Sequence, residues 1–248
     1  MSRLASVTRL LRNDGRRLAR DRFLLGSAAY LAGVSLAMRW LLPWLSRALE
    51  RRRAFDLEPY YGLVVSYFVL FLAAVLVGMI GGFLLLGSRE DRSIRALLVC
   101  PVPIRDYLAG DCIAMVIATT IIAIAESALI GVGRPGWPAT ILIVLTGALG
   151  APICALYLAT FADNEVDAFA QLKIVGASGL ILLGVYFLDP PWQYLACLFP
   201  PYWFVKAWWI AEAGGDGWAL WLLGGVVVSV GILVLLLDRF ETVARRRG

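Results

Sequence analysis

The sequence predicts an all-α polytopic membrane protein with six transmembrane helices. Hydrophobic residues make up 60% of the chain and charged residues only 17%, whereas a soluble domain is about 45–50% apolar and about 25% charged. Long apolar runs recur along the whole sequence. Histidine is absent, and the four cysteines lack the paired spacing of a zinc site. The sequence therefore predicts no catalytic residue and no metal site.

Six apolar runs are long enough to cross a bilayer, which takes about 20 mostly apolar residues. They form a single transmembrane domain over residues 23–248, with spans at about 23–45, 61–86, 108–130, 139–161, 168–188 and 218–237. The fourth span is uncharged but contains Pro152, where a kink is tolerable in lipid. The fifth has a short uncharged part, Ile174 to Leu188, so it must include the polar residues before it.

Basic residues predict the orientation of the chain in the membrane. Sixteen of the 23 Lys and Arg residues flank the spans on the side of both termini, and six lie on the other side. We therefore expect a multi-pass protein of the bacterial cytoplasmic (inner) membrane with both termini in the cytoplasm. All nine tryptophans fall at or beyond the outer ends of these spans. The run Arg51-Arg52-Arg53, in an outer loop, does not fit the charge distribution.

Residues 1–22 place apolar side chains at helical spacing among arginines, which predicts an interfacial amphipathic helix on the cytoplasmic leaflet. A topology signal with no further role explains the pattern equally well. Nucleic-acid binding is not expected, because the segment directly precedes a span and contains no nucleic-acid module. Asp14-Gly15 with Ala19-Arg20 resembles a signature of membrane phosphotransferases that act on CDP-alcohols, but its spacing is one residue too long. The helix that follows also lacks the carboxylates that would hold magnesium.

The stretch GSREDRSIRALLVCPVPIRDYLAGD, residues 87–111, interrupts two apolar runs with a short amphipathic helix. Ile94, Leu97 and Leu98 lie at helical spacing, and charged residues precede them. Pro101 ends the helix, and Pro103 directs the chain back toward the membrane. From composition alone, this helix could equally rest on lipid headgroups.

The same stretch resembles the cytoplasmic loop between helices two and three of the type-2 ABC exporter permeases, a family that includes small drug-export permease subunits. The matching residues are Glu90, Leu97, Leu98, Val99, Pro101, Val102, Tyr107, Leu108 and Gly110. FADNEVDAFAQLK, residues 161–173, is similar to the start of helix five in that family. Residues 189–217, broken by two Pro-Pro pairs, resemble its re-entrant helices between spans five and six. An aromatic anchor at the outer interface is the alternative for this last segment.

The resemblance implies a cytoplasmic coupling helix that inserts into a groove of a separate ABC ATPase subunit. The residues implied in this contact are Arg92, Ile94, Arg95, Leu97, Leu98, Pro101, Pro103, Arg105 and Tyr107. The chain is then the permease subunit of an ATP-driven exporter for a hydrophobic or amphipathic cargo, such as a drug or natural product. A second permease chain, identical or related, is expected beside it.

No GxxxxGK[ST] motif occurs in the sequence, so ATP and magnesium are expected on the partner subunit and no cofactor on this chain. The alternatives are an intramembrane lipid-modifying enzyme and a non-transport membrane sensor or scaffold. The enzyme is disfavoured, because no nucleophile–base pair or paired carboxylates lie at membrane depth.

Two charged residues, Arg39 and Glu126, lie within predicted spans one and three. Both spans start at the cytoplasmic face, and the rise of about 1.5 Å per residue brings the two side chains to similar heights near the outer leaflet. An ionised side chain within a bilayer is costly and is usually paired or faces a polar cavity. The two residues are therefore predicted to form an intramembrane pair, or to lie on a translocation path. Independent contact of each side chain with water is the alternative.

Overall fold

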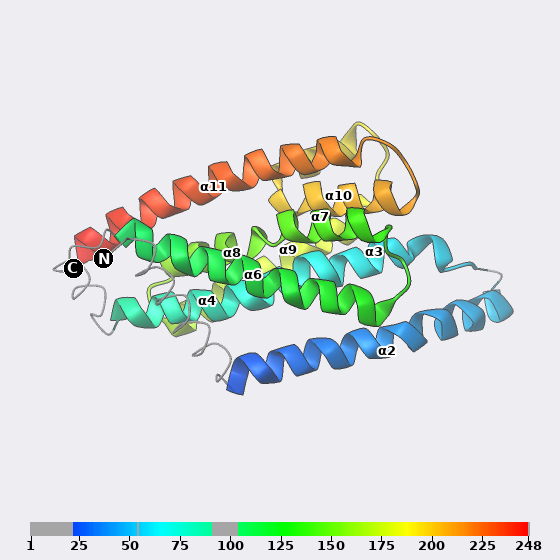
Figure 1. The fold of residues 1–248 in the computed structure, drawn as a ribbon, viewed down its shortest axis with the longest axis horizontal. Helices are drawn as coiled ribbons and strands as arrows, with labels where there is room; N and C mark the ends of the chain where they lie inside the picture. The colour runs from blue at the N-terminus through cyan, green and yellow to red at the C-terminus, as the bar shows by residue number, and fades with distance from the viewer. Residues whose placement is uncertain (1–21, 54, 91–103, 248) are drawn as a thin grey trace.

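The computed structural model describes residues 22–53, 55–90 and 104–247, and the regular structure in these ranges is helical (Figure 1). The first half of the chain contains α2 (Arg22–Arg53), η1 (Glu58–Tyr60), α3 (Tyr61–Ser66), η2 (Tyr67–Leu72), α4 (Ala73–Glu90) and α6 (Ile104–Ile130). The second half contains α7 (Trp137–Gly147), α8 (Gly150–Phe161), α9 (Glu165–Val185), η3 (Trp192–Leu198), α10 (Pro200–Glu212) and α11 (Trp218–Arg247).

Within the described ranges, five helical segments are long and apolar enough to cross a membrane. They are Glu58–Ser88, Leu108–Ile130, Trp137–Phe161, Glu165–Val185 and Trp218–Thr242. They coincide with predicted spans two to six. The first predicted span, 23–45, lies within α2, which is helical but is not one of the five, so the count of six stays a prediction. The predicted amphipathic segment 1–22 lies outside the described residues, except for Arg22 at the start of α2.

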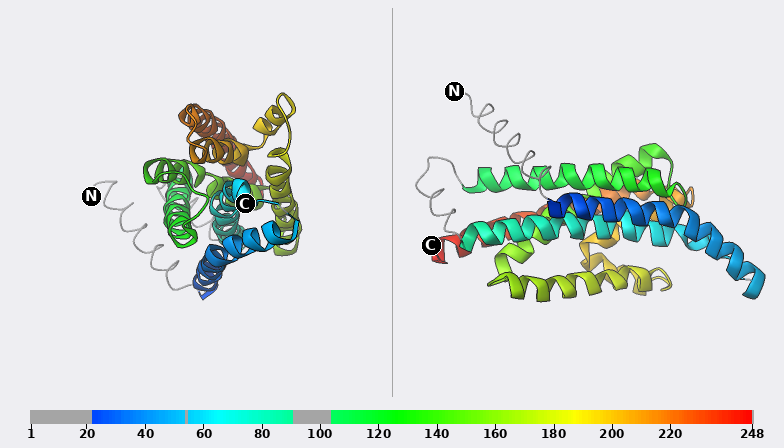
Figure 2. Two further views of the ribbon diagram at one scale, coloured as in Figure 1. Left: turned by 90° about the vertical axis from the view of Figure 1, so that its right-hand side faces the viewer. Right: turned by 90° about the horizontal axis from the view of Figure 1, so that it is seen from below.

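The helices run back and forth along one axis, so that connections gather at two ends of the bundle (Figure 1). The end of α4, the start of α6, the connection from α8 to α9 and the end of α11 lie at one end, on the left. The end of α2, the start of α3 and the loops from α6 to α7 and from α10 to α11 lie at the other. Seen along the axis, α3 and α4 lie near the centre, with α2, α6, α9 and α11 around them (Figure 2).

The second span contains a π-helical segment, η2, between α3 and α4. The sequence predicted one unbroken helix here. A π turn adds a residue without adding a turn, and such turns occur frequently at functional sites. In this protein the segment carries Phe71, which is 3% exposed and packs against Gly179 of α9.

The fourth span is interrupted between α7 and α8, at Ala148 and Leu149. The ring of Pro152, where the sequence tolerates a kink, explains the position of the break. Proline lacks an N–H group and clashes with the carbonyl four residues earlier, which here belongs to Ala148. The amide of Ala151 donates to that carbonyl instead, at 3.1 Å.

The fifth span begins at Glu165, three residues before its predicted start. The side chain of Asn164 accepts a hydrogen bond from the amide of Asp167 at 2.9 Å, which satisfies one of the unpaired donors of the first turn. This cap explains why α9 begins in the polar residues before the apolar run. The helix must begin there, because the uncharged run alone is too short to cross a bilayer.

Candidate functional site

An apolar cavity of about 310 Å³ lies inside the bundle, which is within the usual range for small-molecule pockets of about 300–1,000 Å³. Residues of η2, α4, α7, α8, α9, α10 and α11 line it. Its aromatic lining residues are Phe71, Tyr157, Phe199 and Phe204. Its smallest lining residues are Gly147, Gly150, Ala74, Ser178 and Ser229. None of the described residues that line the cavity is charged.

Three interruptions of regular helix meet at this cavity. The π turn contributes Leu70 and Phe71, the break between α7 and α8 is flanked by Gly147 and Gly150, and the junction of η3 with α10 contributes Phe199, Pro200 and Pro201. Irregular backbone at membrane depth is tolerated only where it is buried in protein or lines a cavity. Their convergence on one space marks this cavity as the candidate binding site.

The lining favours a ligand with a large apolar or aromatic surface and few hydrogen-bonding groups. Phe71 and Phe199 pack together with ring centroids 6.1 Å apart, and Phe71 also meets Tyr67 at 5.5 Å. These distances suit tilted aromatic packing. Ser178, one of the few polar lining residues, donates to the carbonyl of Val175 at 2.6 Å, so its hydroxyl is already engaged within α9.

Hydrogen bonds hold η3 and α10 in place beside the cavity. The ammonium of Lys206 donates to Gln193 Oε1 at 2.7 Å, and Gln193 Nε2 donates to the carbonyl of Val185 at 3.2 Å. Burial lowers the pKa of the Lys206 ammonium, because the charged form loses contact with water. The indoles of Trp208 and Trp209 donate to the carbonyl of Gly133 and to Ser66 Oγ, each at 3.0 Å.

Both short helices fall in the segment predicted as re-entrant. η3 and α10 meet at Phe199 and Pro200 beside the cavity, and the loop after α10 lies at the end of the bundle (Figure 1). The re-entrant course of this segment through the membrane stays a prediction. Its side chains also supply much of the buried aromatic surface, since Tyr202 and Trp208 are fully buried.

Arg39 and Glu126 do not form an ion pair in the described part of the chain. Arg39 Nη1 instead donates to the carbonyl of Leu129, near the end of α6, at 3.3 Å. The last four carbonyls of a helix lack partners within it, so Arg39 caps α6 and joins α2 to it. Glu126 is 2% exposed, and its Oε2 atom has no hydrogen-bond partner. Neither residue lines the apolar cavity.

Glu126 shares one face of α6 with Thr119, seven residues earlier, which is also 2% exposed and has an unpartnered hydroxyl oxygen. Two buried polar atoms thus lack partners on the inner face of this helix. A buried ionisable group within a membrane protein is expensive, and it is usually retained for function. A place for Glu126 on the translocation path stays a prediction.

We expect the effects of replacing Arg39 and Glu126 to add. Arg39→Ala should lower the free energy of unfolding by about 1 kcal/mol, because the carbonyl of Leu129 loses its donor. Glu126→Gln keeps the shape of the buried side chain and does not touch that contact. A double-mutant cycle, followed by unfolding in mixed micelles, measures the coupling. A coupling energy above about 0.5 kcal/mol would restore the predicted pair.

The other predicted site residues belong to the segment predicted to contact the ATPase, and none of them is among the residues that line the cavity. Arg92, Ile94, Arg95, Leu97, Leu98, Pro101 and Pro103 lie outside the described residues. Arg105 and Tyr107 lie in the first turn of α6, where only the backbone is described. Among the described residues, no cluster of three or more His, Cys, Asp or Glu side chains is placed to hold a metal ion.

The membrane-length apolar helices of the described residues identify the chain as a multi-pass membrane protein. Residues 14–237 match the family described as "Fluoroquinolones export permease protein Rv2686c-like", and the chain belongs to this family. Two relatives from Mycobacterium tuberculosis are named fluoroquinolones export permease proteins, MT2760 of strain CDC 1551 and Rv2686c of strain H37Rv. Each is 30% identical over 239 residues, which cover 93% of this chain and 92% of the relative.

Proposed function

We propose that this chain is the membrane-spanning permease subunit of an ATP-driven exporter that moves hydrophobic or amphipathic drug-like molecules out of the cell. The observation that carries the proposal is the apolar, aromatic-lined cavity at the meeting point of three helix interruptions. The names of the two relatives suggest the class of cargo, because fluoroquinolones have a flat aromatic core that suits such a lining. The cargo of this chain is therefore expected to include fluoroquinolones.

ATP hydrolysis is assigned to a separate ABC ATPase subunit. The sequence contains no phosphate-binding GxxxxGK[ST] loop, and residues 87–111 resemble the ATPase-docking loop of type-2 ABC exporter permeases. The flanks of the docking segment support this position, because α4 ends and α6 begins at the same end of the bundle (Figure 1). A second permease chain, identical or related, completes the proposed complex.

We place the chain in the bacterial cytoplasmic membrane, with α2 as a sixth span. The first 24 residues of α2 carry one charged side chain after Arg22, Arg39, and a helix of 32 residues reaches about 48 Å, more than a bilayer core requires. With six spans, both termini lie on the same side of the membrane. The excess of basic residues on that side supports the cytoplasm as its location.

Filling the cavity should abolish drug binding. Ser178 lines the cavity, whereas its neighbour Ala177 is exposed on α9. We expect Ser178→Phe to weaken binding of a fluorescent fluoroquinolone at least tenfold, because the new ring takes the space of the ligand. Ala177→Phe adds the same ring on the outer surface and should bind as the wild type does.

The measurement is fluorescence titration of the purified, reconstituted chain, followed by drug export from cells that also express the ATPase. Folded Ser178→Phe with unchanged affinity and export would show that the cavity does not take the cargo. Loss of export with intact binding would also contradict the proposed cause, since the defect would then lie outside the cavity.

A further inference from the structure

α2 has two opposite faces of different chemistry. One face packs into the bundle through Leu31, Ser35, Met38 and Leu42, which are 2–7% exposed. Their spacing of four, three and four residues follows one side of a helix. The opposite side carries Trp40, Trp44, Arg47 and Arg51 with the same spacing.

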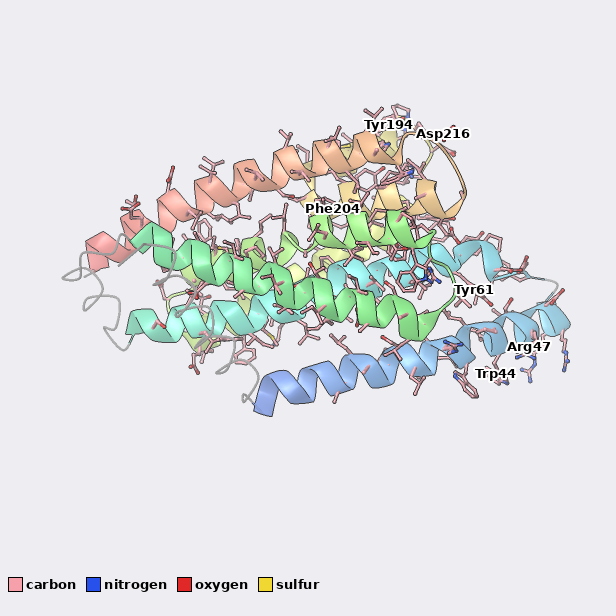
Figure 3. The ribbon with its side chains drawn as sticks, in the orientation of Figure 1. Trp44, Arg47, Tyr61, Tyr194, Phe204 and Asp216 are labelled. Carbon is pink, nitrogen blue, oxygen red and sulfur yellow. The ribbon has the colours of Figure 1, made fainter. Side chains whose placement is uncertain are left out.

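The outer face of α2 is open in the described structure. Trp40 is 71% exposed and Trp44 is 60% exposed, and Arg47 and Arg51 are exposed as well. Figure 3 shows Trp44 and Arg47 pointing away from the other helices. An open groove of about 680 Å³ runs along this part of the helix. Its lining residues are Ala37, Arg39, Trp40, Leu41, Pro43, Trp44 and Arg47.

The charged side chains that line the groove are arginines, Arg39 and Arg47. Neither forms an ion pair with an acidic side chain among the described residues. Glu50 is the one carboxylate in α2, against Arg39, Arg47, Arg51, Arg52 and Arg53 in its second half. The hydrogen bonds of Arg39 and Arg47 go to the backbone carbonyls of Leu129 and Pro43, at 3.3 and 3.1 Å. A guanidinium group has five N–H donors, so donors of both side chains remain available to an anion.

We propose that this groove binds the headgroup of an anionic phospholipid in the leaflet at which α2 ends. Exposed tryptophans are typical of the headgroup level of a bilayer, and guanidinium groups bind phosphate through paired hydrogen bonds. Trp40 and Arg51 are about 16 Å apart along the helix axis. That length lets the indoles lie at the acyl boundary while the arginines reach the phosphates.

A second copy of the chain fits this face less well than a lipid does. In a two-fold contact the same patch meets itself, so Arg47 and Arg51 of one copy would approach the arginines of the other. Like charges brought together at an interface cost free energy. A phosphate supplies the missing negative charge. The site also gives a role to Arg51, one of three outer-loop arginines that the distribution of basic residues left unexplained.

The test uses the full chain in detergent. One sample contains phosphatidylglycerol, which is anionic, and the other contains phosphatidylcholine, which has no net charge. Native mass spectrometry counts retained lipid, and thermal unfolding gives the stabilisation by each lipid. We expect phosphatidylglycerol to be retained preferentially by the wild type. Arg47→Gln with Arg51→Gln should weaken this binding roughly twenty-five-fold, since each arginine near an anionic surface contributes about fivefold. The charge-matched control, Lys173→Gln with Arg239→Gln, replaces cations outside α2 and should keep the preference.

Each other outcome overturns the proposal. Equal retention of the two lipids by the wild type would refute the proposal. This result needs no variant, so the test still works if the double variant fails to fold. Equal losses in the two double variants would mean that binding follows net charge and not this groove. Equal stabilisation by inorganic phosphate would make the ligand a free anion. Dissociation of a dimer by Arg47→Gln with Arg51→Gln in phosphatidylcholine would make the face an interface between copies.

Discussion

Replacing both Leu97 and Leu98 by aspartate is expected to abolish the stimulation of the partner ATPase, while the chain still inserts into the membrane. In the proposed docking, these two side chains and Ile94 form the apolar face that enters the groove of the ATPase. A carboxylate buried without a partner costs several kcal/mol, which is enough to prevent the contact. The spans themselves are unchanged.

The matched control places two aspartates on the other side of the same segment, at Ala96 and Val99. At helical spacing these positions face away from the apolar residues, so ATPase stimulation should remain close to that of the wild type. The measurement is the ATPase rate of reconstituted complexes, with the amount of inserted permease as the reference. Full stimulation by the Leu97→Asp and Leu98→Asp double variant would refute the docking surface.

Gly78→Ala is expected to lower the free energy of unfolding by about 3 kcal/mol. α4 and α8 make the most extensive contact between helices in the described structure. A Cβ atom at Gly78 would lie 2.6 Å from the carbonyl oxygen of Ala151 and 2.7 Å from Cys154 Cβ. Backbone and Cβ atoms cannot rotate away, so the two helices must separate.

Gly176 provides the control for this change. A Cβ atom added there meets no atom within 4 Å, and Gly176 lies in the interior of α9. Alanine has a better helix propensity than glycine by about 1 kcal/mol, so Gly176→Ala should be neutral or stabilising. Unfolding in mixed micelles measures both variants. An unchanged stability of Gly78→Ala would mean that α4 and α8 are less closely packed than the structure describes.

The long spans were predictable because length and hydropathy are properties of the sequence itself. The five membrane-length helices coincide with predicted spans, and even the weak fifth span was correctly extended into polar residues, because Asn164 caps it. The break of the fourth span follows from Pro152 for a local steric reason. Each of these features depends on neighbours within a few residues.

The candidate site could not be predicted in the same way. Its prolines and glycines were visible in the sequence, but only packing brings Phe71, Gly150 and Pro200 together around one cavity. The π turn gave no signal in a run that is uniformly apolar. For Arg39 and Glu126, residue counting predicts height along a helix but not the direction in which a side chain points. Arg39 therefore reaches Leu129, one turn beyond Glu126.

The π turn also divides the second span into two halves with different helical phase. One extra residue rotates everything on one side of it by about 100° relative to a continuous α-helix. Deletion of a single residue between Tyr67 and Leu72 would therefore leave a helix that is still long enough to cross the membrane. It would, however, turn a different side chain toward the cavity in place of Phe71. Among relatives, length variation at this turn is thus expected to change cargo preference in one step, without any substitution in the cavity wall.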